Sequence, residues 1–184
     1  MDKKKIEKGI RMVLEAVGAN LKVKDIAATP KRVAQMYEEI LSGQFKDASR
    51  ELEVILEQKH DEIILLKGIP LYSLCEHHLL PFFGKAHVAY IPDRRITGLS
   101  KIARVVDTLS KRLQVQERLT TEIADVIMKK LKPKGVMVVI EAEHLCMSMR
   151  GAKKAGTVTN TSVVRGVFRS NSKTRQEALS LIAS

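Results

Sequence analysis

The order of periodic segments after residue 60 limits the possible folds more than any other feature of the chain. Two stretches have the pattern of strands, two amphipathic helical stretches follow, and two more strands complete the series. In chain order these segments are residues 62–74, 84–92, 99–113, 119–131, 135–147 and 156–168. Two hairpins joined through a helix pair predict an α+β layer, in which an antiparallel four-stranded sheet carries the helix pair on one face.

The residues before this series are predicted to be helical. Residues 3–17 place apolar side chains on one helical stripe, and residues 28–41 begin with Thr29 as a plausible N-cap and Pro30 at the first helical position. A third helix is expected over residues 47–58. We therefore predict an N-terminal helical region over residues 1–58 and a second region over 59–184 that carries the chemical groups, the two forming one integrated unit.

Charge and hydropathy exclude some functional classes. The net charge of +11 attracts polyanions such as nucleotides or nucleic acid, although lysines scattered over helices usually form a solvated surface. No apolar run approaches the roughly 20 residues that a membrane span needs, and the charged start lacks the apolar centre of a secretory signal. We expect a cytoplasmic protein that binds no membrane, whose two cysteines stay reduced rather than form a disulfide.

Two short windows hold both cysteines and three of the five histidines, "CEHH" at residues 75–78 and "EHLC" at residues 143–146. Cys75 and His78 have a spacing that lets a thiolate and an imidazole reach one ion from a tight turn. Cys146 would add a third ligand and leave one position open, as catalytic zinc sites do. His77 and His144 are nearby histidines that could transfer protons. The alternative is that these residues are ordinary buried polar and apolar side chains.

A second cluster is suited to an anion. Gly98 precedes a predicted helix whose first turns carry Ser100, Lys101 and Arg104, and a helix start offers free backbone N–H groups. Arg150 follows the second metal window directly. These groups form a plausible phosphate cradle, although a solvated basic helix end would look the same.

Glu117 lies at the start of the next helix, where the helix dipole favours an acid in any case. A carboxylate also pairs with the adjacent N–H donors of a guanine edge, and nothing local separates the two roles.

Four segments in this order, "CEHHLLPFFGKAHVAYIP", "GLSKIARVVD", "QVQERLT" and "HLCMSMRG", resemble the zinc-dependent GTP cyclohydrolase I family over roughly residues 28–182. The resemblance implies the tunnelling fold, a homodecamer of two stacked five-membered rings, and active sites between subunits. It implies GTP as substrate, without nucleic acid as a partner. The implied reaction opens the guanine imidazole ring at C8, releases formate and, after ribose rearrangement, yields 7,8-dihydroneopterin triphosphate.

The resemblance also implies a role for each matching residue. Zn²⁺ is expected on Cys75, His78 and Cys146, and proton transfer is expected from His77, His144 and Ser100. Glu117 would anchor guanine, beside Gln116. The triphosphate contacts would be Ser100, Lys101, Arg104 and Arg150, with Arg32 from a neighbouring subunit. Gln35 departs from the family, because some members have a lysine there that faces the phosphates, so affinity for the triphosphate could be weaker.

Three alternatives stay open at the level of the sequence. Another tunnelling-fold enzyme, such as a nitrile reductase of deazaguanine biosynthesis, would use a cysteine nucleophile and NADPH instead of zinc. A zinc-stabilised nucleic-acid binder is compatible with the charge, although the seven aromatic residues offer no obvious stacking platform. A purely structural oligomer would give the open metal position no purpose. The downstream use of the product, in folate, biopterin or deazapurine synthesis, is not predicted.

Overall fold

The computed structural model describes residues 1–52, 55–57 and 60–184. The chain divides into two compact units, Met1–Ser42 and Gly43–Ser184. The sequence-based boundary between residues 58 and 59 stays a prediction about domain organisation. Among the described residues, no helix combines the length and the apolar character that crossing a membrane requires.

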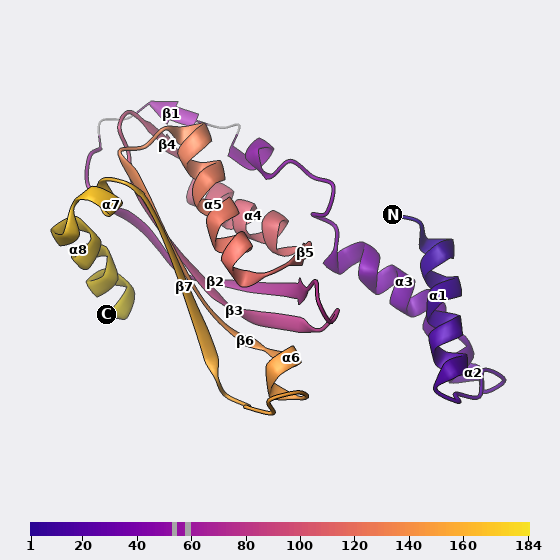
Figure 1. Cartoon of the computed structure of the whole chain (residues 1–184). Helices are drawn as coiled ribbons and strands as arrows, with labels where there is room; N and C mark the ends of the chain where they lie inside the picture. The colour runs from indigo at the N-terminus through magenta and orange to yellow at the C-terminus, as the bar shows by residue number, and fades with distance from the viewer. Residues whose placement is uncertain (53–54, 58–59) are drawn as a thin grey trace. The chain divides into compact units, whose positions relative to one another are not determined.

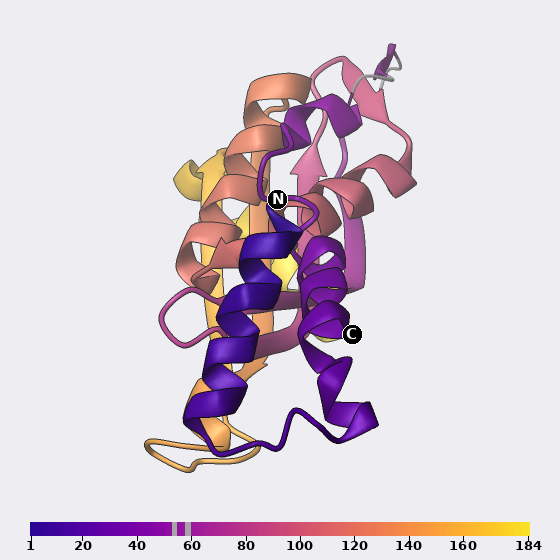
Figure 2. The ribbon, with the colours of Figure 1, turned by 90° about the vertical axis from the view of Figure 1, so that its right-hand side faces the viewer.

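The N-terminal unit is helical, as predicted for residues 3–17 and 28–41. Its elements are α1 (Lys3–Ala16), α2 (Lys24–Ala27) and α3 (Thr29–Ile40). Asp2 caps α1 by accepting a hydrogen bond from the backbone N–H of Lys5, and Pro30 lies in the first turn of α3. Figure 2 shows α1 and α3 side by side, and Lys3 Nζ lies 3.1 Å from Glu38 Oε2 across this pair.

The C-terminal unit is built on a five-stranded sheet with the order β5-β2-β3-β6-β7 (Figure 1). Its long strands are β2 (Ile64–Cys75), β3 (Pro81–Ile91), β6 (Gly135–His144) and β7 (Val158–Gly166), and neighbours among them are antiparallel. The prediction of four antiparallel strands was therefore incomplete. The fifth strand, β5 (Leu113–Gln114), is parallel to β2, and two residues are too few to produce a periodic pattern.

The prediction of a helix over residues 47–58 was wrong. The described residues there form a short 3₁₀-helix, η1 (Ala48–Leu52), and a strand, β1 (Ile55–Glu57), while residues 53–54 and 58–59 lie outside the described part of the chain. Strand β1 pairs antiparallel with β4 (Arg95–Thr97). This pairing joins segments about 40 residues apart, so a contact that local propensity cannot reveal decides the structure.

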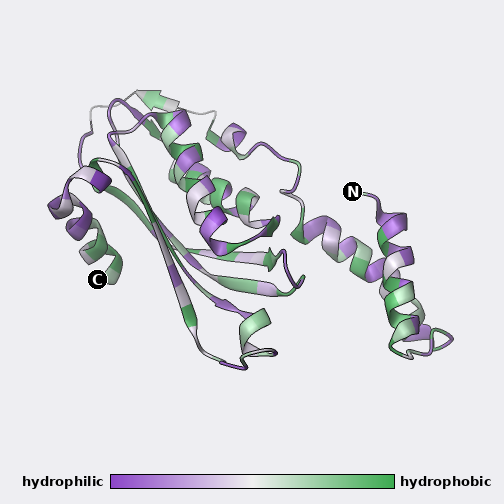
Figure 3. Ribbon diagram, viewed as in Figure 1, coloured by the Kyte–Doolittle hydropathy of each residue, from purple (hydrophilic) through white to green (hydrophobic). Residues whose placement is uncertain are grey.

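The predicted helix pair is confirmed on one face of the sheet. Helices α4 (Leu99–Ser110) and α5 (Gln116–Leu131) turn their apolar stripes toward the strands, and Figure 3 shows hydrophobic and hydrophilic residues mixed along α5. The core beneath them includes Ile102, Val106, Ile123, Ile127, Phe82, Val88 and Val138, all fully buried. The opposite face is partly covered by α7 (Val167–Ser170) and α8 (Ser172–Ala183), through Phe168 and Ala178.

Candidate active site

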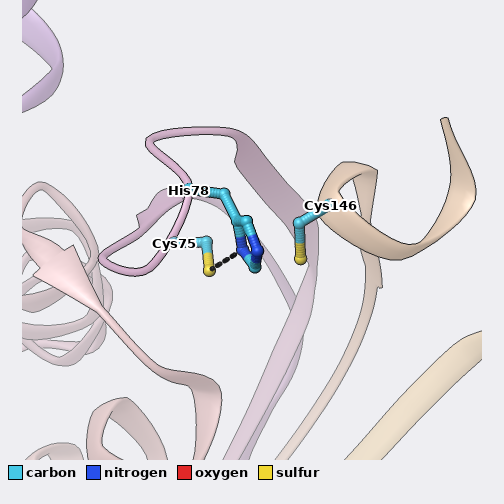
Figure 4. A group of neighbouring side chains, drawn as sticks. All are labelled: Cys75, His78 and Cys146. Carbon is cyan, nitrogen blue, oxygen red and sulfur yellow. Dashed lines mark hydrogen bonds between the residues drawn. The ribbon is translucent and has the colours of Figure 1, made fainter. Parts of the chain in front are cut away.

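The first metal-binding window forms a tight turn between β2 and β3. Cys75 ends β2, and its backbone carbonyl accepts hydrogen bonds from the N–H groups of His78 and Leu79, at 3.3 and 2.8 Å. Leu79 has a positive φ of 53°, a conformation that reverses the chain and is uncommon for a residue with a side chain. The reversal brings the His78 ring over the thiol, with 3.7 Å between Nδ1 and the Cys75 Sγ (Figure 4).

The second window reaches the same place through strand pairing. Phe82, just after the turn, pairs with His144, the last residue of β6, and the short helix α6 (Leu145–Ser148) follows at once. The Cys146 side chain extends from α6 toward the His78 ring (Figure 4). The ligand atoms of Cys75, His78 and Cys146 all lie within 4.8 Å of one another. The structure thus brings together the three residues that the sequence predicted as metal ligands.

These residues suit a zinc ion. Two ligand atoms on one tetrahedral zinc lie about 3.5–3.8 Å apart, because zinc–sulfur and zinc–nitrogen bonds measure about 2.3 and 2.0–2.1 Å. The observed 3.7 Å between Cys75 and His78 already matches that spacing. Burial, reinforced by the neighbouring Cys75, raises the pKa of the Cys146 thiol, so a bound cation would have to displace its proton. Two soft sulfur donors and an imidazole favour zinc over magnesium or calcium.

Arg150 lies next to this cluster, where the sequence placed a phosphate contact. Its Nη1 is 3.2 Å from His78 Nε2. A guanidinium can only donate, so Nε2 accepts this hydrogen bond and Nδ1 is the nitrogen that faces the Cys75 sulfur. Both Arg150 and His78 are exposed, so the guanidinium is accessible to a ligand beside the cluster.

His144 is held in one orientation from two sides. Its ring stacks on Phe82 with centroids 4.7 Å apart, and its Nε2 lies 2.7 Å from Gln116 Oε1. The Gln116 amide cannot be reversed without losing hydrogen bonds, because its NH2 group, which has two hydrogens to donate, faces three acceptor oxygens at 2.9–3.1 Å: Ile140 O, Thr159 O and Thr161 Oγ1. Oε1 therefore faces the histidine, whose Nε2 carries the hydrogen and whose Nδ1 keeps its lone pair.

Burial lowers the pKa of His144, and the charge of Glu117 partly offsets this effect. The imidazole is therefore neutral at pH 7, in the tautomer that Gln116 selects. Glu117 itself is exposed at the start of α5, next to the buried Gln116. The start of α5 thus acts on His144 in two ways, through the hydrogen bond with Gln116 and through the charge of Glu117. The buried position of Gln116 favours a role in orienting His144, and direct contact with a substrate stays a prediction.

His77 lies at the edge of the metal cluster. Its side chain is 63% exposed, and its Nδ1 is 4.0 Å from the Cys75 Sγ. Its role in proton transfer stays a prediction.

Three of the other predicted phosphate contacts, Ser100, Lys101 and Arg104, lie on α4, which begins away from the metal cluster within one chain. Ser100, Lys101 and Arg104 lie in the first turns of α4, whereas the C-terminal end of that helix leads into β5, next to Cys75. Twelve helical residues span about 18 Å, so the first turn of α4, with Ser100 and Lys101, lies about that far from the helix end that adjoins the cluster, and Arg104 lies about halfway along. Arg32 is exposed on α3 in the N-terminal unit. Their roles stay predictions.

Sequence reasoning missed one pair in this region. The two terminal nitrogens of Arg118, on the first turn of α5, donate to the two carboxylate oxygens of Glu76, at 2.8 and 2.7 Å. This contact lowers the pKa of Glu76. Residues 42 positions apart carry no local signal of such a contact.

Comparison with known proteins agrees with this geometry. The sequence model of the family described as GTP cyclohydrolase I matches residues 6–183. The GTP cyclohydrolase 1 of Carboxydothermus hydrogenoformans is 58% identical over 99% of this chain and 95% of its own length. The enzyme of that name from Pelotomaculum thermopropionicum is 59% identical, over 98% and 97%.

A crystal structure of an apo archaeosine synthase, QueF-like, covers 59% of this chain and 97% of its own, with 17% identity and a TM-score of 0.47, which supports no conclusion. The match to the sequence model and the two relatives, by contrast, extend over almost the whole chain. The chain belongs to the GTP cyclohydrolase I family.

Proposed function

We propose that this protein opens the imidazole ring of GTP at C8, releases formate and forms 7,8-dihydroneopterin triphosphate, using a zinc ion on Cys75, His78 and Cys146. The observation that carries the proposal is the convergence of these three ligand atoms within 4.8 Å, in a chain that belongs to the GTP cyclohydrolase I family. When bound there, zinc supplies Lewis-acid chemistry that makes hydroxide available near neutral pH.

His144 is the proposed proton donor and acceptor for the guanine ring. Its Nε2–H donates a hydrogen bond to Gln116 Oε1, so Nδ1 is the atom that can take up a proton and pass it to N7 of the base. Protonation at N7 draws electron density from C8 and makes that carbon a better electrophile. The low pKa of His144 makes its protonated form a stronger acid, which favours this transfer.

Glu117 is the proposed anchor of the guanine edge. Its carboxylate lies one residue from Gln116 and is close enough to influence the pKa of His144. A carboxylate that accepts two N–H donors would hold the base in one orientation relative to the His144 ring. His77, exposed beside Cys75, and Ser100 are the proposed groups for the later proton transfers, in which the ribose opens, rearranges and closes onto the freed amine.

The triphosphate is proposed to bind Arg150 from the chain that supplies the metal ligands, and Ser100, Lys101 and Arg104 from another copy. Support comes from the length of α4, which separates its first turn from the cluster within one chain. If a neighbouring copy completes the site, its α4 residues and the Arg150 of the first chain can bind the same triphosphate. We infer a homo-oligomer of this kind, with the decamer and tunnelling fold of the family, and with Arg32 contributed by a neighbouring copy. The free thiols of the site favour a reducing cytoplasm.

The test is direct. The purified protein is incubated with GTP, with and without a zinc chelator, and the product is oxidised and measured as a fluorescent pterin alongside formate. The proposal predicts equal amounts of pterin and formate, lost on chelation and restored by zinc. Turnover that survives complete removal of metal would contradict the metal role, and absence of both products from the zinc-loaded protein would contradict the function.

A further inference from the structure

We propose that Arg118 is a positioning residue which, through Glu76, holds the turn bearing Cys75, His77 and His78 against the first turn of α5, where Glu117 lies. The inference rests on the proposed function, because it concerns the spacing between the metal ligands and the acid that anchors guanine.

The contact has the geometry of a positioning device. Both terminal nitrogens of Arg118 bind both oxygens of Glu76, at 2.8 and 2.7 Å, and a two-point contact fixes orientation as well as distance. Glu76 is also held by its backbone, whose N–H donates to the Gln114 carbonyl at 3.0 Å. Glu76 stands between Cys75 and His77, so these two attachments set the position of the turn between them.

The first turn of α5 contacts both ligand-bearing segments. Gln116 binds His144, two residues before Cys146, and Arg118 binds Glu76, directly after Cys75. Side chains two residues apart on a helix point about 160° away from each other, so these two reach toward nearly opposite sides of the helix. Glu117 lies between them. One rigid helical turn thus connects both halves of the metal cluster to the proposed guanine anchor.

Stability alone is a poor explanation for this pair. The Arg118 and Glu76 side chains are 42% and 31% exposed, and ion pairs at such positions add little to folding. Residues that orient metal ligands from outside the coordination sphere, by contrast, commonly change metal affinity or activity about 10- to 100-fold when replaced. We therefore expect the pair to affect the site more than the fold.

The experiment compares Glu76→Gln, Arg118→Gln and the double variant in the full-length protein. The control is Arg165→Gln, because Arg165 forms a similarly exposed ion pair with Asp125, at 3.0 Å, that contacts no predicted site residue. Three quantities are measured: Co²⁺ affinity from the visible absorption of the bound ion in competition with a chelator, kcat and KM for GTP, and the midpoint of urea unfolding.

Each single variant is expected to lose about 10-fold in Co²⁺ affinity and about 10- to 100-fold in kcat/KM, with the unfolding midpoint close to that of the control. The double variant should lose no more than the worse single variant, because the two residues act as one unit. The Co²⁺ affinity and kcat/KM of Arg118→Lys should lie between those of the wild-type protein and Arg118→Gln, since an ammonium makes one contact with the carboxylate where a guanidinium makes two.

Co²⁺ affinity that matches the control, or losses that add in the double variant, would overturn the inference. Glu76→Gln keeps the size of the side chain, so it remains informative if Arg118→Gln does not fold. The two proposals fail differently. If the wild-type protein forms no pterin, the proposed function is wrong, whereas the Co²⁺ comparison still decides whether the pair positions the metal-binding turn.

Discussion

Replacing Gln116 by Met tests the orientation of His144 most sharply. Met has a similar volume but neither donates nor accepts the hydrogen bonds of the amide. Gln116 is 1% exposed; its Oε1 accepts from His144 and the two hydrogens of its Nε2 donate to a set of acceptor oxygens, which amounts to about three hydrogen bonds. At about 1 kcal/mol for each bond, the free energy of unfolding should fall by about 3 kcal/mol.

The same substitution should reduce turnover. Without the Gln116 oxygen, Nε2 of His144 loses the acceptor that selects its tautomer, so Nδ1 is no longer reserved for proton transfer. Because positioned proton transfer contributes about 10²–10⁴-fold, we expect kcat to fall by about 100-fold, with a smaller change in KM. Urea unfolding measures the first effect, and pterin formation at saturating GTP measures the second.

Thr161→Val is the matched control. It removes the Thr161 hydroxyl, which bonds Gln116 Nε2 at 3.1 Å and Thr120 Oγ1 at 2.7 Å, but leaves the bond between Gln116 and His144. It should cost about 1–2 kcal/mol of stability and leave kcat unchanged. Equal losses of kcat in the two variants, or full kcat in Gln116→Met, would refute the role assigned to Gln116.

Three further substitutions separate the roles of metal, base and phosphate contacts. Cys146→Ser should abolish zinc binding and formate release, and in the wild-type protein zinc affinity should rise by at least about tenfold per pH unit, since burial keeps the Cys146 thiol protonated at neutral pH and zinc must displace that proton. Retained activity after exhaustive chelation, or a flat pH dependence in a competition titration, would contradict this. Glu117→Gln should raise KM for GTP about 10- to 100-fold with unchanged unfolding, because an amide offers only one acceptor to two guanine donors; an unchanged KM would exclude the anchor. Lys101→Ala should raise KM about 10-fold with kcat preserved, whereas the exposed Lys129→Ala should change neither, and a loss confined to kcat would argue against phosphate binding.

The parts of the fold that the sequence predicted are those with long periodic patterns. The apolar stripes of α4 and α5 and the alternation in β3 extend over many residues, so their assignment did not depend on distant contacts. Strands β1 and β5 have three and two residues, and each exists only because a distant segment pairs with it. The composition of residues 47–58 favoured a helix, whereas pairing with β4 makes residues 55–57 a strand.

Some features of the candidate site could also be predicted from local sequence, and others could not. Cys75 and His78 share a turn, so their spacing predicted their proximity, and the pairing of β3 with β6 brings in Cys146. The burial of Gln116 and the contact of Arg118 with Glu76 depend on tertiary structure and could not be predicted from either segment. The separation of the α4 first turn from the cluster also appears only in the folded chain.

The central claim is that Cys75, His78 and Cys146 bind one zinc ion in the protein that converts GTP. Zinc X-ray absorption spectroscopy of the active, zinc-loaded protein tests this claim most directly. We expect one zinc per chain, with two sulfur neighbours at about 2.3 Å and at least one nitrogen neighbour at about 2.0–2.1 Å. A spectrum from fully active protein with only nitrogen and oxygen neighbours would contradict it.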